Sequence, residues 1–452
     1  MLDSPGRPVH ALERRIGFWS AVAVVIGSTI GSGIFRSPAG IADKLPGPLP
    51  MLAVWAAGGV FALCGALTLA EVASALPQTG GMYVFCRDGW GRLAGFLFGW
   101  GQFSMIRAAS LGAIAITFSE YFFRVTGQNP QAPDKVMAVR WFAAFAIALT
   151  AGFNILGVRF ASNVSNVTVI AKYGGLVFIV LVALVIGLPK TGGGHFAPPV
   201  PAGSFSMAAF GLALVSTLWA FDGWADLAYN AGEVKDPQRN LPRALIGGTL
   251  LVVAIYLAAN VAYLAVLPIE KIRVSKLVAA DVAEVVLGSA GAAFVSVTVM
   301  VSTFGTLNTV LFTSPRVFFA MAADRLFFAP VASVHPRFGT PWISISMTAG
   351  LGIVFVLLRN FEQLADAFVT AFLPFYALAV ASIFRLRKKP GYAPTFRVPL
   401  YPVLPIIFLV SVLYLLGNAI VQPESRWSTL AVLGVVAAGV PVYYLTVGRR
   451  TA

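Results

Sequence analysis

Hydrophobic segments about as long as a bilayer is thick recur along the whole of this 452-residue chain. Hydrophobic residues make up 58% of the sequence, charged residues only 11%, and the mean hydropathy is +0.82, values that lie outside the range of soluble domains. The sequence therefore predicts an all-α integral membrane protein with twelve transmembrane helices. The expected spans are 16–37, 50–75, 90–119, 140–157, 166–188, 207–231, 241–267, 287–320, 342–358, 364–386, 401–421 and 427–447.

The distribution of Lys and Arg predicts the orientation of these spans. Basic residues are more numerous and more clustered in the loops on the side of both tails, 1–15 and 448–452, for example in the run 385–389. Because cytoplasmic loops are enriched in Lys and Arg, we expect both termini to be cytoplasmic in a plasma (inner) membrane. The net charge of +14 is dispersed among the spans, so it does not favour nucleic-acid binding.

The sequence offers little for chemistry other than binding. The two cysteines, Cys64 and Cys86, suggest no disulfide framework, and the three histidines fall in tails or loops. No metal-ligand spacing and no pairing of a nucleophile with a base stands out. We therefore expect neither a cofactor nor a metal, and no enzymatic activity.

Two of the predicted spans are interrupted at their centres. Glycine-rich clusters lie at 27–33 in the first span and at 221–224 in the sixth. Unwound backbone at membrane depth must line a cavity or bind a ligand, and breaks at matching places in two halves of a chain indicate a transporter's binding site. The first span enters the membrane from the inside and the sixth from the outside, which predicts an inverted repeat of residues 16–188 and 207–386, with 401–447 as peripheral helices.

The direction of each broken helix predicts what the breaks bind. The second half of the first helix begins near Ser32 and Gly33, so its N–H groups and positive dipole end favour a carboxylate. Free carbonyls at 26–29 favour an ammonium group. The corresponding carbonyls of the sixth helix are those of Trp219, Ala220 and Phe221. Together the breaks would bind a zwitterion, although Gly27 and Gly31 also fit a helix-packing motif, and both interpretations can hold.

Four charged residues at membrane depth have alternative interpretations. Asp222 either caps the inner half-helix or contacts a substrate side chain, whereas capping or packing is favoured for Asp226. Lys172 either extends to the inner headgroups or supplies an ammonium group between helices. For Arg107 a structural ion pair is favoured.

Several motifs resemble those of the amino acid, polyamine and organocation transporter superfamily. They include IGSTIGSGIF at 26–35 with Pro38, and the segment 70–83, which contains Pro77, Gly80, Gly81 and Tyr83. The branch of L-amino acid transporters is resembled by LWAFDGW at 218–224, GEVKDPQRNLPRA at 232–244, MIRAAS at 105–110, SEY at 119–121 and RVFFAMAAD at 316–324. The resemblance covers nearly the whole chain.

This resemblance implies a five-plus-five inverted-repeat fold with two additional helices, and alternating access around a midplane site. By matching position, Ser32 and Gly33 would hold the α-carboxylate, and Ile26 and Thr29 would hold the α-amino group with Trp219, Ala220 and Phe221. Gly31, Asp222 and Gly223 complete the site, and Trp219 is the outer gate. Lys172 matches a lysine that replaces the sodium site, and Tyr256 a tyrosine linked to it.

Two departures from the family pattern matter. Members with a glycoprotein partner carry an outer-loop cysteine after the third span, and 120–139 contains none, so we expect no disulfide-linked ancillary subunit. Asp222 stands where several neutral-substrate members have a small residue and a dibasic member has an acid, which argues against a purely neutral preference.

The sequence thus predicts a sodium-independent L-amino acid transporter that exchanges its substrates. One alternative keeps the fold but couples transport to protons through Lys172, with cationic amino acids among the substrates. A sensor that binds amino acids without moving them, or a membrane-embedded enzyme, would need a signalling domain or a reactive group, and neither is evident.

Overall fold

The computed structural model describes residue 14 and residues 16–156 and 173–447, and this part of the chain is helical with no strand. The first half contains α1 (Phe18–Thr29), α2 (Gly33–Lys44), α3 (Pro48–Ala75), α4 (Met82–Trp90), α5 (Arg92–Gly101), the π-helix η1 (Gln102–Ile106), α6 (Arg107–Val125), α7 (Val136–Leu156) and a helix over Tyr173–Lys190 that ends in η2 (Ala183–Gly187) and α9 (Leu188–Lys190).

The second half is also built from long helices joined by short ones. It contains α10 (Met207–Phe221), the 3₁₀-helix η3 (Asp226–Glu233), α11 (Pro237–Val266), α12 (Ile269–Val274), α13 (Val278–Ala323), η4 (Ala329–Ala332), α14 (Trp342–Leu358), α15 (Phe361–Leu386), α16 (Val403–Val421), α17 (Pro423–Ala437) and α18 (Gly439–Thr446). The eighth predicted span, 287–320, begins close to a kink at Gly288 inside α13, where φ is 73°.

The all-α membrane fold predicted from hydropathy is confirmed. Within the described ranges, nine helices are long and apolar enough to cross a membrane, and α1 with α2 form a tenth, bent by 41°. The remaining two predicted spans are also helical. One is the run α5, η1 and α6, which carries the buried Arg107 and Glu120, and the other is α14, only 17 residues long.

The first predicted span ends too early. The predicted span stops at residue 37, but α2 continues to Lys44, and Arg36 within it is only 3% exposed. Hydropathy alone misses this turn of helix because its charged side chains pair with other helices, so the segment is buried although it is polar.

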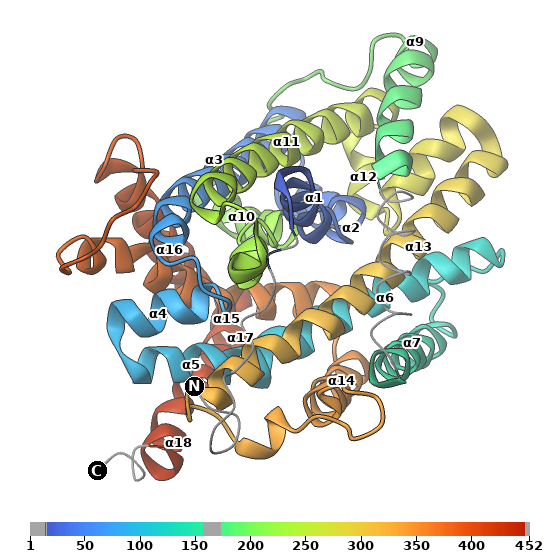
Figure 1. Ribbon diagram of the computed structural model, residues 1–452. Helices are drawn as coiled ribbons and strands as arrows, with labels where there is room; N and C mark the ends of the chain where they lie inside the picture. The colour runs from blue at the N-terminus through green and yellow to red at the C-terminus, as the bar shows by residue number, and fades with distance from the viewer. Residues whose placement is uncertain (1–13, 15, 157–172, 448–452) are drawn as a thin grey trace.

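The broken helices lie at the centre of the bundle. Figure 1 shows α1 and α2 enclosed by α10, α11 and α13, with α18 at one edge. We call the end at which α1 begins the inner end, and the opposite end the outer end. α10 packs on α2, whereas η3 packs on α1, so the two broken helices run antiparallel and each half contacts the corresponding half of the other.

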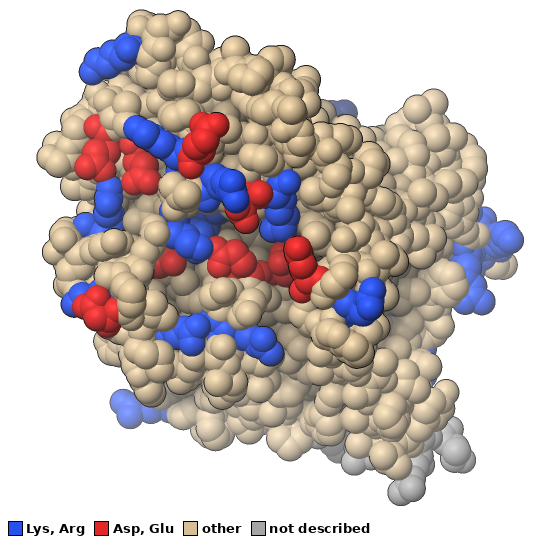
Figure 2. All heavy atoms as spheres, turned by 180° about the vertical axis from the view of Figure 1, so that it is seen from behind, with Lys and Arg blue, Asp and Glu red and all other residues tan. Residues whose placement is uncertain are grey.

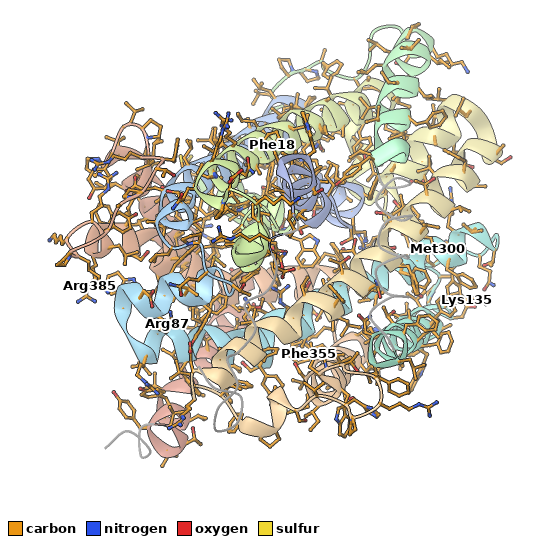
Figure 3. The ribbon with its side chains drawn as sticks, viewed as in Figure 1. Phe18, Arg87, Lys135, Met300, Phe355 and Arg385 are labelled. Atoms are coloured by element: carbon orange, nitrogen blue, oxygen red, sulfur yellow. The ribbon has the colours of Figure 1, made fainter. Side chains whose placement is uncertain are left out.

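A buried carboxylate joins several segments at the inner end. Glu71, at the end of α3, is fully buried and accepts hydrogen bonds from Arg387 Nε (2.8 Å) and Nη2 (2.6 Å) and from the Val398 N–H (2.7 Å). The bond to Glu71 raises the pKa of Arg387, so this guanidinium stays charged. Figure 3 shows Arg87 of α4 and Arg385 of α15 on one side of the bundle and Lys135 on the other. Arg385 Nη1 donates a hydrogen bond to the Gly89 carbonyl at the end of α4 (3.3 Å). The segment after α15 is thereby fastened to α3 and α4.

We predict that Glu71→Ala lowers the free energy of unfolding by about 2–4 kcal/mol, because it removes one partner of a buried ion pair and leaves the other uncompensated. The measurement is the thermal unfolding midpoint in detergent. Glu424→Ala is the control, because Glu424 lies in the first turn of α17 and belongs to none of the ion pairs among the described residues. An unchanged midpoint in Glu71→Ala would contradict the prediction.

Candidate functional site

The structure places both breaks where the glycine clusters predict them. α1 ends at Thr29 and α2 begins at Gly33. α10 ends at Phe221, and after a turn the chain continues as η3 from Asp226. The inner half of the sixth helix is therefore a 3₁₀-helix instead of the expected α-helix, which leaves four residues of backbone at the centre of the bundle outside regular helix.

The two breaks touch backbone to backbone. A Cβ atom at Gly33 would lie 2.4 Å from Ala220 Cα, and one at Gly223, where φ is +108°, would lie 2.5 Å from the carbonyl carbon of Ser28. No real Cβ approaches other atoms so closely, so both contacts require glycine. At Gly31, by contrast, a Cβ would meet nothing closer than 3.9 Å.

Tyr256 of α11 joins the two breaks. Its hydroxyl lies 2.9 Å from the Thr29 carbonyl at the end of α1 and 2.9 Å from the Ala220 carbonyl near the end of α10, and its side chain is fully buried. Both carbonyls belong to last turns of helices and lack intrahelical partners. Because a phenol has a single proton, it satisfies one carbonyl at a time. The other carbonyl keeps acceptor capacity for a cation.

The remaining predicted residues of the site differ in whether their polar groups are already bonded. Ile26 does not present a free carbonyl, because its oxygen accepts from the Ile30 N–H (2.8 Å), which terminates α1; this expectation was wrong. Ser32 is 2% exposed, and its Oγ has no hydrogen-bond partner. The ring of Phe221 packs on Trp55 and Tyr256, with centroids 5.9 and 5.1 Å away, so its side chain is engaged with α3 and α11.

On the outer side of the breaks, the predicted Trp219 is joined by aromatic and charged side chains that sequence reasoning missed. Trp219 packs edge-on against Phe361 and Phe368 of α15, with centroids 6.0 and 5.0 Å away. Above this layer, Arg36 pairs with Glu120 and with Glu362, each at 3.0 Å, and lies over the Phe361 ring. A charged residue inside the first hydrophobic span, such as Arg36, was the available signal.

Ion pairs between helices are concentrated at the outer end. Figure 2 shows acidic and basic side chains gathered around a hollow on the face turned away from the viewer in Figure 1. Two more ion pairs lie at this end. Lys276 Nζ is 3.0 Å from Glu362 Oε1, and Arg124 Nη2 is 3.3 Å from Asp281 Oδ1. These contacts join α2, α6, α13 and α15 on the outer side of the breaks.

Asp222 faces an aromatic pocket on the other side of the sixth helix. Its Oδ1 accepts a hydrogen bond from the Tyr376 hydroxyl of α15 (2.6 Å). The carboxylate therefore has a partner on a distant helix, which neither of the two sequence-based expectations for Asp222 included. The pocket is lined by Phe61, Leu218, Phe221, Asp222, Trp224, Phe368, Val369, Phe372, Leu373 and Tyr376.

Two further charged residues complete the surroundings of the site. Asp226 lies against Ser28 and within electrostatic reach of Arg107. The structural ion pair expected for Arg107 is not formed, because none of the salt bridges within the described ranges includes it. Lys172 lies outside the described residues, so its predicted position is not tested.

Comparisons with known proteins agree along the whole chain. The profile of the family described as Amino acid permease matches residues 16–440. Serine/threonine exchanger SteT of Bacillus subtilis (strain 168) is 34% identical over 439 residues, which cover 96% of this chain and 97% of that protein. The b(0,+)-type amino acid transporter 1 of Homo sapiens is 30% identical, covering 97% and 88%. Large neutral amino acids transporter small subunit 2 of Homo sapiens is 31% identical, covering 97% and 81%.

We predict that Tyr256→Phe lowers the free energy of unfolding by about 1–3 kcal/mol, because two buried carbonyls lose their shared donor. The control is Tyr263→Phe, since Tyr263 lies on the same helix, is equally buried and makes only a 3.4 Å contact with the Ile34 carbonyl. Thermal unfolding of the purified proteins measures both. Equal losses in the two variants would argue against a special role for the Tyr256 hydroxyl.

We also predict that Gly33→Ala forces the broken helices apart. The added methyl would overlap the Ala220 backbone, and we expect a loss of about 1–3 kcal/mol from overpacking. Gly40→Ala in the same helix meets nothing within 4 Å and should preserve stability. A midpoint for Gly33→Ala equal to that of Gly40→Ala would show that the two backbones do not need to meet this closely.

Proposed function

The chain belongs to the amino acid permease family of membrane transporters, and from this membership we propose that it is a sodium-independent exchanger of L-amino acids that works by alternating access. The chain is thus a transporter and not an enzyme. The observation that carries the proposal is the backbone contact between the two broken helices at Gly33 and Gly223, because it brings opposite helix ends together at the centre of the bundle.

The proposed substrate site reads the two charges on an amino acid's α-carbon. Gly31, Ser32 and Gly33 would hold the carboxylate at the start of α2, where backbone N–H groups and the helix dipole favour an anion. The buried, unpartnered Oγ of Ser32 supports this role. The ammonium group would bind the carbonyl of Thr29 together with those of Trp219, Ala220 and Phe221, with Ile26 contributing apolar contact, because its oxygen is already bonded.

Gating in this proposal depends on the outer half of the sixth helix. Trp219 covers the site from the outside, and its contact with Phe361 and Phe368 supports that role. Opening of the outer side would separate Trp219 from α15 and break the Arg36 pairs with Glu120 and Glu362. Opening of the inner side would move α1 and η3, and each state would be favoured by its own contacts with substrate.

Sodium independence is proposed from Lys172 and Tyr256. The ammonium of Lys172 would stand where other transporters bind sodium. Tyr256, which contacts both breaks, would transmit the state of that position to the substrate site. Proton symport through Lys172 is the alternative form of coupling.

We propose cytoplasmic termini in the plasma membrane, as the loop charges predict, and activity without a disulfide-linked subunit. The name of one relative describes a small subunit, so that protein assembles with another chain. In this chain both cysteines, Cys64 and Cys86, are buried, which supports independence from such a link.

The test uses proteoliposomes loaded with unlabelled amino acid or left empty, and follows uptake of labelled Ala, Leu, Ser, Arg and Glu. We expect uptake into loaded vesicles to exceed uptake into empty ones, and to be equal in sodium and choline. Sodium dependence would contradict the role of Lys172, and equal uptake into loaded and empty vesicles would contradict exchange.

The same assay tests substrate choice and coupling. Relatives are named for serine and threonine and for large neutral amino acids, whereas Asp222 favours a cationic side chain. A preference for Arg that is lost in Asp222→Gly would identify this carboxylate as the reader of the side chain. Uptake into empty vesicles driven by a pH gradient would favour proton symport over exchange.

A further inference from the structure

Two of the sequence motifs meet at the inner end of the bundle, where the proposed function gives them no role. The motif over 70–83 ends at Tyr83, the second residue of α4, and the motif over 316–324 ends at Asp324, directly after α13. The Tyr83 hydroxyl donates a hydrogen bond to Asp324 Oδ2 (2.5 Å) across a separation of 241 residues. The last residues of the two motifs are therefore direct partners.

Arg87 adds an ion pair to this contact. It lies one helical turn after Tyr83, so both side chains project from the same face of α4. Arg87 Nη1 is 2.6 Å from Asp324 Oδ2, the oxygen that also accepts from Tyr83, and Arg87 Nε is 2.7 Å from Asp88 Oδ1. The guanidinium lies over the Tyr83 ring, 5.4 Å from its centroid. One carboxylate oxygen thus receives two donors from α4, and hydrogen bonds to a charged acceptor are the stronger class.

The turn at 79–81, which precedes α4, lies against η3. The Gly80 N–H donates to the Tyr229 carbonyl of η3 (3.1 Å). Gly81 has a φ of +50°, and a Cβ atom there would lie only 2.8 Å from the Ala228 carbonyl carbon. Both the conformation and the close approach favour glycine. The turn and the inner half of the sixth helix therefore fit together backbone to backbone.

The end of α4 is fixed to a different helix. Trp90 Nε1 donates to the Leu378 carbonyl of α15 (2.8 Å), and a Cβ atom at Gly89 would lie 2.5 Å from Ser382 Cβ. α15 thus holds the last turn of α4, whereas Asp324 binds the residues before it. The side of α4 that leads into the turn at 79–81 is the side that Asp324 holds.

We propose that Asp324 is a positioning residue, which acts through Tyr83 and Arg87 to hold the beginning of α4 and the turn at 79–81 against η3. Because η3 is the inner half of the sixth helix, the position of this turn limits the movement of η3 in the proposed exchange cycle. The bonds to Asp324 keep the turn in place while η3 approaches it and leaves it.

The experiment measures the position of the turn as the rate at which a disulfide forms between Thr79→Cys and Gly232→Cys. A Cβ atom at Gly232 would lie 3.6 Å from Thr79 Cβ, a separation that a disulfide can span. The parent chain has both natural cysteines replaced by Ala, and the oxidant is copper phenanthroline in detergent. We expect Asp324→Ala to slow the reaction roughly tenfold, because the turn loses two hydrogen bonds to a charged group.

The control is Glu424→Ala, which removes a carboxylate from the first turn of α17 and should leave the rate unchanged. Tyr83→Phe combined with Arg87→Met should slow the disulfide about as much as Asp324→Ala. Adding Asp324→Ala to that double should slow it no further, because Asp324 acts through these two side chains.

Several outcomes would overturn the proposal. They are a parent chain that forms no disulfide, an Asp324→Ala rate within about twofold of the parent, an equal loss in Glu424→Ala, or a further loss when Asp324→Ala is added to the double. Where Asp324→Ala does not fold, the test is Asp324→Asn, which keeps an acceptor for Tyr83 but removes the charge. Its rate should lie between those of the parent and of the double, and a rate equal to the parent's would contradict the proposal.

The inference rests on the proposed exchange only for a second measurement, the uptake of amino acid into loaded proteoliposomes. We expect Asp324→Ala to lower uptake roughly tenfold, in step with the disulfide rate. Unchanged uptake beside a slowed disulfide would overturn the link to the movement of η3. Where the unmodified protein shows no exchange, the proposed function fails, and the disulfide rates still decide whether Asp324 positions the turn.

Discussion

The structure depends on a constraint that the bilayer imposes: backbone polar groups at membrane depth need partners. Two helices break at the centre of this bundle, and their interrupted backbones pack directly against each other. Glycine at positions 33 and 223 lets the backbones meet, and Tyr256 provides a donor that reaches one carbonyl on each side. The helices that surround the breaks, α3, α11 and α13 among them, are positioned around this central contact (Figure 1).

Charge is distributed around that contact in two different ways. At the outer end, Arg36 pairs directly with Glu120 and with Glu362, each at 3.0 Å, and these bonds join α2 to α6 and α15. Beside the breaks, Asp222 instead accepts a hydrogen bond from the Tyr376 hydroxyl, and Arg107 belongs to none of the ion pairs among the described residues. Direct ion pairs thus join the helices at the outer end, whereas a neutral phenol meets the carboxylate at the centre.

Much of the fold could be predicted because membrane helices have a strong local signal. Apolar runs located the spans, and glycine clusters located both breaks, since each property is carried by neighbouring residues. The errors occurred where a segment is polar but buried. The first span was predicted to end at residue 37 although α2 continues to Lys44, and the free carbonyl expected for Ile26 is bonded to Ile30. The site residues themselves stay predictions until substrate binding is measured.

The order of residues along the chain was enough to predict the helical membrane fold, the positions of the breaks and, through its motifs, the family. Hydropathy and helix propensity act locally, so neighbouring residues carry these signals. Which polar groups become partners depended on how the helices pack: Tyr376 with Asp222, Tyr256 with two carbonyls, and Arg36 with Glu120 and Glu362. These partners lie as far as 227 residues apart in the sequence. A polar side chain's own neighbours carry no information about which distant helix will pack against it, so only the assembled bundle brings the two together.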